Sequence, residues 1–179
     1  MIYPYISGVD YESVADGPGV RTAIFLSGCT HNCPGCHNPQ THDPCFGKEI
    51  GELIIGTIAH NINIRNFLSG ITLTGGDPLY DTDKTYQFLY SLRNKICNRW
   101  EKLSVWLYTG YTWEQLMKLY PTYQNLQHLL SMVNVVVDGP FIQKQADKTL
   151  AFRGSSNQRL IDVQKSLQQG VPVLWNPET

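Results

Sequence analysis

The sequence predicts an α/β fold in which a parallel sheet forms a partial, open (β/α) barrel. Short apolar segments typical of buried strands alternate with segments of helical periodicity along the chain. Four such strand-helix units favour parallel strands that are joined by right-handed crossovers. Four units are too few for an eight-stranded barrel, so we expect an open one, extended by strands at either end of the chain.

The 179 residues suit a single domain, residues 1–179, that is long enough to bury its own core. With 14 basic and 15 acidic residues, the charge favours neither a nucleic acid nor a membrane surface as partner. There is no apolar run of membrane-spanning length, and the first residues lack the basic and apolar regions of a signal peptide. We therefore expect a cytoplasmic protein whose thiols stay reduced.

The first strand is predicted over residues 21–28. The segment before it is expected to be irregular and to end in a tight turn at Asp16-Gly-Pro-Gly19. The strand contains the continuous apolar run Ala23-Ile-Phe-Leu26, which is typical of a strand that is buried on both faces. It leads directly to Cys29.

A helix is predicted from Ile50 to about Arg65, followed by a strand over residues 70–74 that runs into Gly75-Gly-Asp-Pro78. Asp81 is a suitable cap for the next helix. The inner face of that helix carries apolar residues at helical spacing: Tyr86, Leu89, Leu92 and Ile96.

A third strand, residues 103–108, ends at Thr109-Gly-Tyr111. Thr112 and Gln115 then form a capping box for a helix through Leu119. After Pro121 a further helical segment carries Leu126, Leu129 and Leu130, and the fourth strand, residues 133–137, stops at Asp138-Gly-Pro140. The remaining chain predicts a hairpin of residues 149–153 and 158–163, followed by a tail with little periodicity from residue 168.

Each predicted strand is followed by residues with unusual chemistry: three cysteines, a Gly-Gly-Asp-Pro turn, a Thr-Gly-Tyr turn and an Asp-Gly-Pro turn. The carboxyl ends of parallel strands share one edge of the sheet, where sites are built. We therefore expect these motifs to meet in one site.

The cysteine motif Cys29-x3-Cys33-x2-Cys36 places three thiols in a loop. A zinc ion or a cubane cluster normally takes four ligands, so a cluster held here has an iron that is open to another molecule. A disulfide is disfavoured, because the chain has five cysteines and three close thiols cannot all pair. A structural zinc remains an alternative, and its fourth ligand is then one of His31, His37, His42 or Cys45.

Three stretches together resemble the radical S-adenosylmethionine glycyl-radical activases: Asp16-Gly-Pro-Gly-Val-Arg21, Phe25 through Pro39, and Gly75-Gly-Asp-Pro-Leu79. The likeness covers roughly residues 5–160. The segments Trp106 to Tyr111, Val135 to Gly139 and Phe152 to Gln158 are most similar to the activases of anaerobic ribonucleoside-triphosphate reductase.

The resemblance implies an oxidoreductase of the type that activates formate C-acetyltransferase, with the partial barrel of the radical S-adenosylmethionine proteins. Cys29, Cys33 and Cys36 would hold a 4Fe-4S cluster, and S-adenosylmethionine would chelate the fourth iron. Reductive cleavage would give a 5′-deoxyadenosyl radical, which abstracts hydrogen from a glycine of the partner. That partner would be the large glycyl-radical subunit of the anaerobic reductase, and the electron donor would be a reduced flavodoxin or ferredoxin.

The same resemblance implies the ligand contacts. Gly75 and Gly76 would bind the methionyl amine, with Asp77 adding charge complementarity, and Gly35 and His37, on either side of Cys36, would touch the adenosyl group.

Further residues are expected to meet the partner. The Asp16 to Gly19 turn would lie near its glycine segment, and Arg21 or Arg153 would bind a backbone group or carboxylate there. Asp138 is expected to belong to a tight turn, and Cys45 to be a bystander. His37 and Asp16 resemble instead the activases of pyruvate formate-lyase, which therefore stays an alternative partner.

Overall fold

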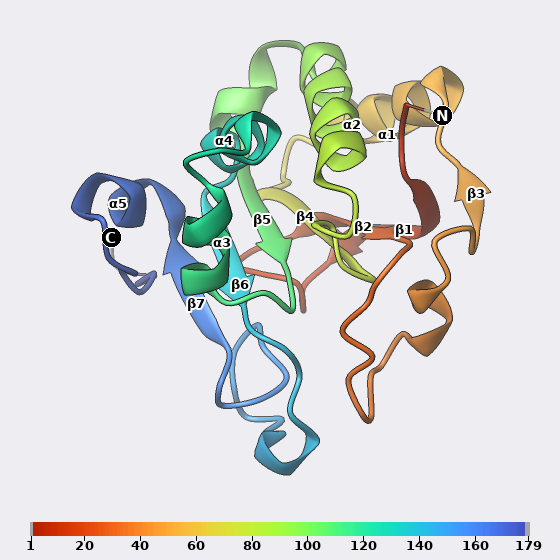
Figure 1. Ribbon diagram of the computed structural model, residues 1–179. Helices are drawn as coiled ribbons and strands as arrows, with labels where there is room; N and C mark the ends of the chain where they lie inside the picture. Colours follow the sequence, from red (N-terminus) through yellow and green to blue (C-terminus); the bar gives the residue numbers. More distant parts are fainter. Residues whose placement is uncertain (1, 178–179) are drawn as a thin grey trace.

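The computed structural model describes residues 2–177, which contain one mixed sheet in the order β3-β1-β2-β4-β5-β6-β7 (Figure 1). Its four central strands are parallel: β2 (Arg21–Leu26), β4 (Gly70–Gly75), β5 (Ser104–Tyr108) and β6 (Val135–Asp138). These are the four strands predicted from the apolar runs, so the α/β class with a parallel sheet is confirmed.

Both edges of the sheet are antiparallel. β1 (Tyr5–Ser13) pairs with β2 and with the short β3 (Lys48–Glu49), and β7 (Arg159–Asp162) pairs with β6. The prediction of an irregular opening segment was wrong. The register of β1 against β2 shifts twice, after Ile6 and after Asp10, so the alternation that marks a strand is lost from its sequence.

The helices are α1 (Glu52–Ile64), α2 (Thr82–Lys95), α3 (Trp113–Leu119), α4 (Gln124–Ser131) and α5 (Val163–Gln169). Short 3-10 turns occupy Pro39–His42, Cys97–Lys102 and Gln143–Gln145. Among residues 2–177, no helix combines the length and apolarity needed to cross a bilayer.

Two of the predicted helix starts are confirmed, whereas the first helix begins at Glu52 and not at Ile50. The Asp81 side chain accepts a hydrogen bond from the Lys84 backbone amide at 3.1 Å and so caps α2. Both hydrogen bonds of the capping box between Thr112 and Gln115 are present at the start of α3. These caps fix where the turns after β4 and β5 give way to helix.

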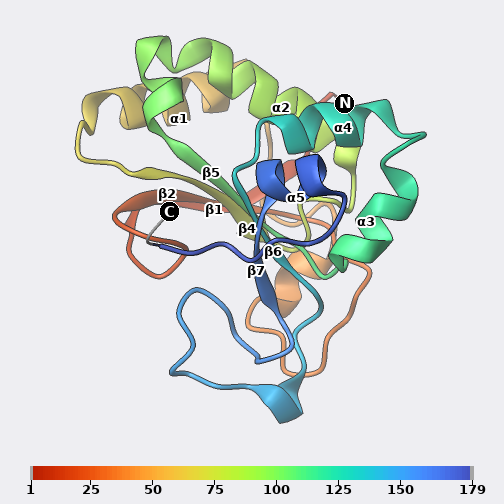
Figure 2. The same cartoon turned by 90° about the vertical axis from the view of Figure 1, so that its left-hand side faces the viewer.

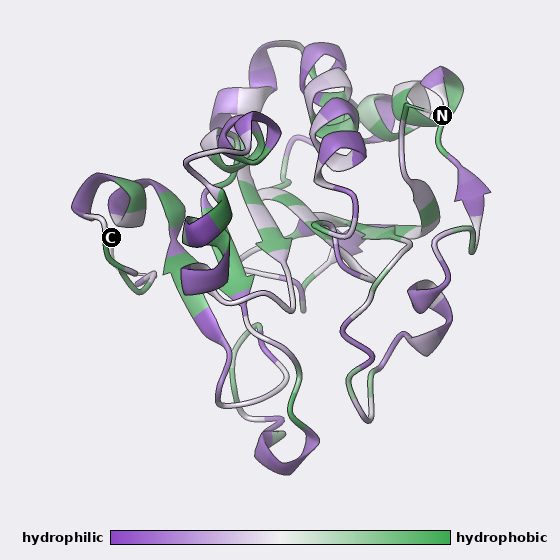
Figure 3. Ribbon diagram, viewed as in Figure 1, coloured by the Kyte–Doolittle hydropathy of each residue, from purple (hydrophilic) through white to green (hydrophobic). Residues whose placement is uncertain are grey.

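The main core lies between the sheet and the helices α1, α2 and α4, which cover one face (Figures 1 and 2). Ile24, Leu73, Leu107 and Val136, one from each parallel strand, are fully buried in it. Figure 3 shows the apolar residues gathered in the strands and on the inner sides of the helices. A smaller cluster on Trp106 occupies the other face and includes Phe152 and Trp175.

The predicted C-terminal hairpin was wrong. Arg159–Asp162 pairs with β6 along its free edge, whereas residues 149–153 form no strand. In this position Ile161 is fully buried in the main core, and Leu160 packs against the Trp106 cluster. The tail also contains α5, which was not predicted. Its signals were Asp162, which accepts from the Lys165 amide at 3.0 Å, and the left-handed Gly170 at its end.

Candidate active site

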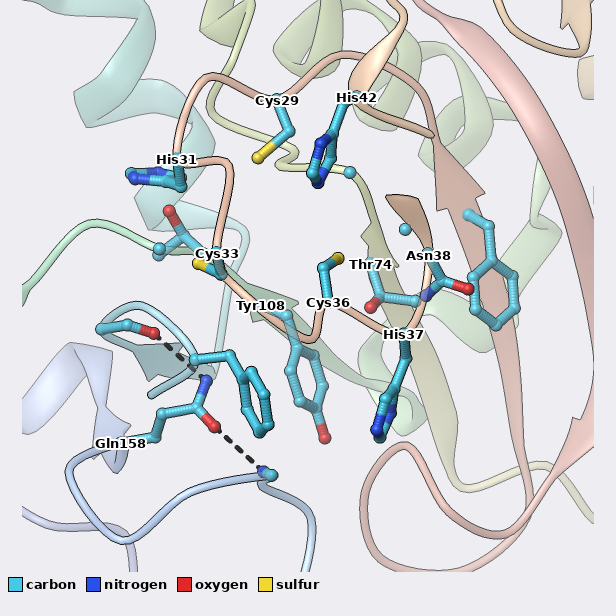
Figure 4. Close-up of a pocket in the computed structure, with 18 of the residues that line it drawn as sticks. Cys29, His31, Cys33, Cys36, His37, Asn38, His42, Thr74, Tyr108 and Gln158 are labelled. Carbon is cyan, nitrogen blue, oxygen red and sulfur yellow. Dashed lines mark hydrogen bonds between the residues drawn. The ribbon is translucent and has the colours of Figure 1, made fainter. Parts of the chain in front are cut away.

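A pocket opens at the carboxyl ends of the four parallel strands, where the predicted motifs were expected to meet. Its lining includes the three cysteines and residues after each of the strands: Cys29, Cys33, Cys36, Gly75, Gly76, Thr109, Gly110, Gly139 and Phe141. Figure 4 shows Cys29, Cys33 and Cys36 around one opening, with Tyr108, His37 and His42 beside them. The expectation of one shared site is confirmed.

The cysteine loop is closed at its base by backbone hydrogen bonds. The amide of Gly28 donates to the Thr41 carbonyl at 2.8 Å, and the amide of Cys29 donates to the His42 carbonyl at 3.3 Å. Within the loop, the Cys36 amide donates to the Cys33 carbonyl at 3.1 Å, which makes a tight turn. Backbone hydrogen bonds therefore anchor the base of the loop and place Cys33 and Cys36 in one tight turn.

Burial raises the pKa of the Cys29 thiol, and the negative charge of Asp77 acts in the same direction. The backbone amides of His31 and Asn32 oppose this by donating toward the sulfur. All three cysteines are half-buried, whereas Cys45 is exposed and does not line the pocket. Cys45, which was expected to be a bystander, therefore lies outside the pocket lining.

Gly75 and Gly76 line the pocket floor, and neither has room for a side chain. A Cβ atom on Gly76 would lie 2.5 Å from the Gly28 carbonyl oxygen, and one on Gly75 would lie 2.5 Å from that of Leu26. Gly75 also has a φ of 102°, a conformation that favours glycine. The pair is therefore required for β4 to pack against the start of the cysteine loop, a reason that the sequence did not reveal.

Asp77 is buried next to the pocket, and protein groups occupy both of its carboxylate oxygens. Oδ2 contacts His31 Nε2 at 2.7 Å, and it accepts from the Thr109 hydroxyl at 2.9 Å and the Gly110 amide at 3.0 Å. Oδ1 accepts from the Leu79 amide at 2.8 Å. Asp77 does not line the pocket. It joins the cysteine loop to the turns after β4 and β5.

His31 is fixed further by its neighbours after β5. Its ring makes an edge contact with Tyr111, with centroids 4.6 Å apart. A Cβ atom on Gly110 would lie 2.3 Å from the ring, so only glycine allows His31 to pack here.

Gly35 and His37 were predicted to flank a ligand, and both are exposed. His37 lines the pocket, whereas Gly35 does not. Gly35 has a φ of 77°, and a Cβ atom there would lie 3.1 Å from Gln143. The His37 ring lies 5.8 Å from the ring of Phe141. Both residues thus meet the segment after β6, which forms the facing wall.

Of that facing wall, only the Asp-Gly-Pro turn was predicted from the strand pattern as part of the site. Gln158 organises it: its Oε1 accepts from the Gly154 amide at 2.9 Å, and its Nε2 donates to the Gly139 carbonyl at 3.1 Å (Figure 4). The Tyr108 hydroxyl donates to the Phe152 carbonyl at 2.7 Å, and burial raises the pKa of this phenol. The motif of residues 152–158 was the available sequence signal.

The comparisons with known proteins agree with this site. A family model described as a 4Fe-4S single cluster domain matches residues 15–161. The anaerobic ribonucleoside-triphosphate reductase-activating protein of Enterobacteria phage T4 is 33% identical over 160 residues, which cover 89% of this chain and 93% of the relative. Its counterpart in Escherichia coli K12 is 34% identical over 146 residues, 81% of this chain and 90% of the relative. The chain belongs to this family of reductase-activating proteins.

The thiols of this activating-family chain are suited to a cluster. Within residues 2–177, no three His, Cys, Asp or Glu side chains converge closely enough to hold a single metal ion. Thiolates are the ligands that a 4Fe-4S cluster takes from a protein. Three half-buried thiols that line one pocket fit this donor chemistry.

Asp16, in the turn that was expected near the glycine segment of the partner, lines the pocket. Its Oδ2 accepts from the Ser13 hydroxyl at 2.6 Å, and its carbonyl accepts from the Thr72 hydroxyl at 2.7 Å. The turn is therefore anchored to β4.

Arg21 does not face a partner. It is completely buried and donates to Thr72 Oγ1 at 2.9 Å, to the Ile71 carbonyl at 2.8 Å and to both oxygens of Ser104. The expectation that Arg21 binds a partner segment was wrong, because the long side chain turns inward under Trp106, with its guanidinium 5.3 Å from the ring centre. Burial lowers the pKa of Arg21 to about 10.

Asp138 is a structural residue, in agreement with the tight-turn prediction. Its Oδ2 accepts from the Trp113 amide at 2.7 Å, and both carboxylate oxygens accept from Arg159. Arg159 also pairs with both oxygens of Glu114. These contacts tie the start of α3 to β6 and β7.

Proposed function

We propose that this chain is a radical S-adenosylmethionine activase that generates the glycyl radical of anaerobic ribonucleoside-triphosphate reductase. One observation carries the proposal: the three thiols and the ends of all four parallel strands line a single pocket. The names of the relatives support the reductase as partner. We infer that the sheet is the partial, open (β/α) barrel of that class, with the pocket on its helix-free face.

Cys29, Cys33 and Cys36 would hold a 4Fe-4S cluster. When bound, the cluster supplies the electron that cleaves S-adenosylmethionine for removal of a hydrogen atom from the partner glycine. The residues of the chain itself would bind S-adenosylmethionine and orient it. Gly75 and Gly76 offer backbone groups to the methionyl part, and Gly35 and His37 flank the adenosyl part.

Asp77 acts in this proposal as a positioning residue, because its carboxylate is fully engaged by protein donors. Burial raises the pKa of the Tyr108 phenol. Its hydroxyl holds the facing wall at Phe152.

We also propose a cytoplasmic setting, a reduced flavodoxin or ferredoxin as electron donor, and the large glycyl-radical subunit as the partner. His37 and Asp16 favour pyruvate formate-lyase as the second candidate partner. Both line the pocket.

The test is anaerobic reconstitution with iron and sulfide, then reduction and addition of S-adenosylmethionine. The assays are 5′-deoxyadenosine formation and the glycyl radical of the reductase by electron paramagnetic resonance. We expect both signals for the unmodified protein and for Cys45→Ala, whose thiol is exposed and outside the pocket. Cys33→Ala should lose both.

A radical on pyruvate formate-lyase and none on the reductase would keep the chemistry and change the partner. A colourless protein that binds one zinc per chain and forms no 5′-deoxyadenosine would refute the proposed function.

A further inference from the structure

Arg153 is the only arginine within residues 2–177 for which no hydrogen bond, ion pair or aromatic stacking partner is found. The other five arginines all contact protein groups: Arg21, Arg65, Arg93, Arg99 and Arg159. The Nε atom of Arg153 is buried and has no acceptor. An arginine keeps its charge, and a buried donor without an acceptor is costly. The Nε atom is enclosed, so a second molecule can reach only the terminal nitrogens of Arg153, which are not among the buried atoms and for which no acceptor is found within residues 2–177 either.

The backbone before Arg153 is held in an uncommon conformation. Phe152 has a φ of 58°, which is rare for a residue with a bulky side chain. Its carbonyl accepts from the Tyr108 hydroxyl at 2.7 Å, and its ring packs on Trp106 with centroids 5.6 Å apart. Strained residues of this kind persist where the surroundings fix them, and they cluster at functional sites.

The backbone after Arg153 is fixed as well. The amides of Gly154 and Ser155 both donate to Gln158 Oε1, and the Ser155 hydroxyl accepts from the Ile142 amide at 3.2 Å. Gly154 itself lines the pocket opposite the cysteines. Arg153 therefore belongs to a backbone segment that is fixed on both sides, and it directly precedes a residue that lines the pocket. An ion pair formed there would cost little backbone entropy.

The charge of this rim favours an anion. Segment 141–158 contains Lys144, Lys148 and Arg153 but only one acidic residue, Asp147. Asp147 accepts hydrogen bonds from Thr149 within its own turn. Both lysines are exposed, and neither forms an ion pair within the described residues.

We propose that Arg153 binds a carboxylate of the partner, on the segment that presents the target glycine to the pocket. A planar guanidinium matches a carboxylate with two parallel hydrogen bonds, so this contact would set the register of that segment. The inference rests on the proposed function and adds a recognition residue to it.

The test compares Arg153→Gln with Lys148→Gln, which removes the same charge from an exposed position of the same loop. The reconstituted proteins are titrated anaerobically with the reductase and, separately, with S-adenosylmethionine. For Arg153→Gln we expect the Kd of the reductase to rise about ten- to hundredfold, the range for a hydrogen bond to a charged group. The Kd of S-adenosylmethionine should change less than about twofold, because the proposed carboxylate belongs to the partner. Lys148→Gln should bind the reductase nearly as the unmodified protein does.

Arg153→Lys keeps the charge but loses the paired hydrogen-bond geometry. Its Kd for the reductase should therefore lie between the values of the unmodified protein and of Arg153→Gln. The proposal is overturned if Arg153→Gln binds the reductase normally, or if Lys148→Gln weakens binding equally. It is also overturned if only the affinity for S-adenosylmethionine falls, since the carboxylate would then belong to that ligand. Binding is compared only among proteins that retain iron and form 5′-deoxyadenosine when the reductase is in excess. A protein that forms no 5′-deoxyadenosine under these conditions would contradict the proposed function and not the role of Arg153.

Discussion

The Nε2 atom of His31 lies 2.7 Å from Oδ2 of Asp77 and joins the middle of the cysteine loop to the turn after β4. The same Asp77 oxygen accepts from Thr109 and Gly110 after β5. One buried carboxylate thus connects the ends of three neighbouring parallel strands. The positions of the cysteines depend on this connection as well as on the loop itself.

Asp77→Asn should loosen this connection. The amide keeps the size of the side chain but replaces one acceptor oxygen with a donor, which opposes the donors around it. We expect the free energy of unfolding to fall by about 2 kcal/mol, together with fewer iron atoms retained per reconstituted chain. Urea unfolding and iron analysis measure both. Asp10→Asn, at an exposed position, is the control, and an equal loss there would argue against a specific role for Asp77.

Arg21→Met should destabilise the fold without a specific effect on the partner. The substitution leaves the carbonyls of Ile71 and Ser104 without their buried donors, and we expect a loss of about 2 to 4 kcal/mol by urea unfolding. Arg93→Met, which breaks an exposed pair with Glu101, should change stability by less than about 1 kcal/mol. Equal stabilities of the two variants would contradict the buried role of Arg21.

Gly76→Ala should be strongly unfavourable, since the new methyl group would meet the backbone oxygens of Gly28 and Thr41 at 2.5 and 2.8 Å. We expect a loss of about 1 to 3 kcal/mol in the free energy of unfolding. Gly56→Ala offers the matched control: it lies within α1, and a Cβ atom there meets nothing within 4 Å. That change should stabilise the protein by about 0.5 to 1 kcal/mol. A stable Gly76→Ala protein would show that the two backbones can separate.

The pairing of Glu114 with Arg159 predicts that the stability of the fold depends on pH. Its hydrogen bond with Arg159 lowers the pKa of the carboxyl from 4.5 to about 2. A depressed pKa in the folded state contributes stability above the unfolded value, and that stability is lost as pH falls through the folded value. Glu114→Gln should therefore be less stable than the unmodified protein at pH 7, and the difference should shrink between pH 4.5 and about 2. Thermal unfolding of both proteins across this pH range measures the difference in stability. A difference that stays constant with pH would contradict the stabilising role of the Glu114 carboxylate.

The parallel part of the fold was predictable because its strands are buried on both faces. Ala23 to Leu26 and Val135 to Val137 form continuous apolar runs, and this signal does not depend on distant contacts. β1 was missed, and β7 was predicted as a strand but with the wrong partner, for the opposite reason. The register shifts of β1 hide its alternation, and β7 depends on the free edge of a strand that precedes it by many residues.

For the site, the residue types could be predicted but their orientation could not. The three cysteines and the two glycines lie where their motifs indicated. The sequence could not distinguish Arg21 from Arg153, because both are basic residues next to glycine-containing turns. Only packing shows that the first is enclosed by β4 and β5 and that the second has no protein acceptor.

The two walls of the pocket come from widely separated parts of the chain, and this imposes an order on biosynthesis. The cysteine loop follows β2, near the N-terminus, whereas the facing wall of Gly139 to Gln158 is held by β6 and β7. During synthesis the cysteine loop leaves the ribosome before the facing wall does. Nascent molecules therefore carry three uncovered thiols, which are most vulnerable to oxidation at that stage. Oxygen during translation should lower the yield of competent protein more than the same exposure after release.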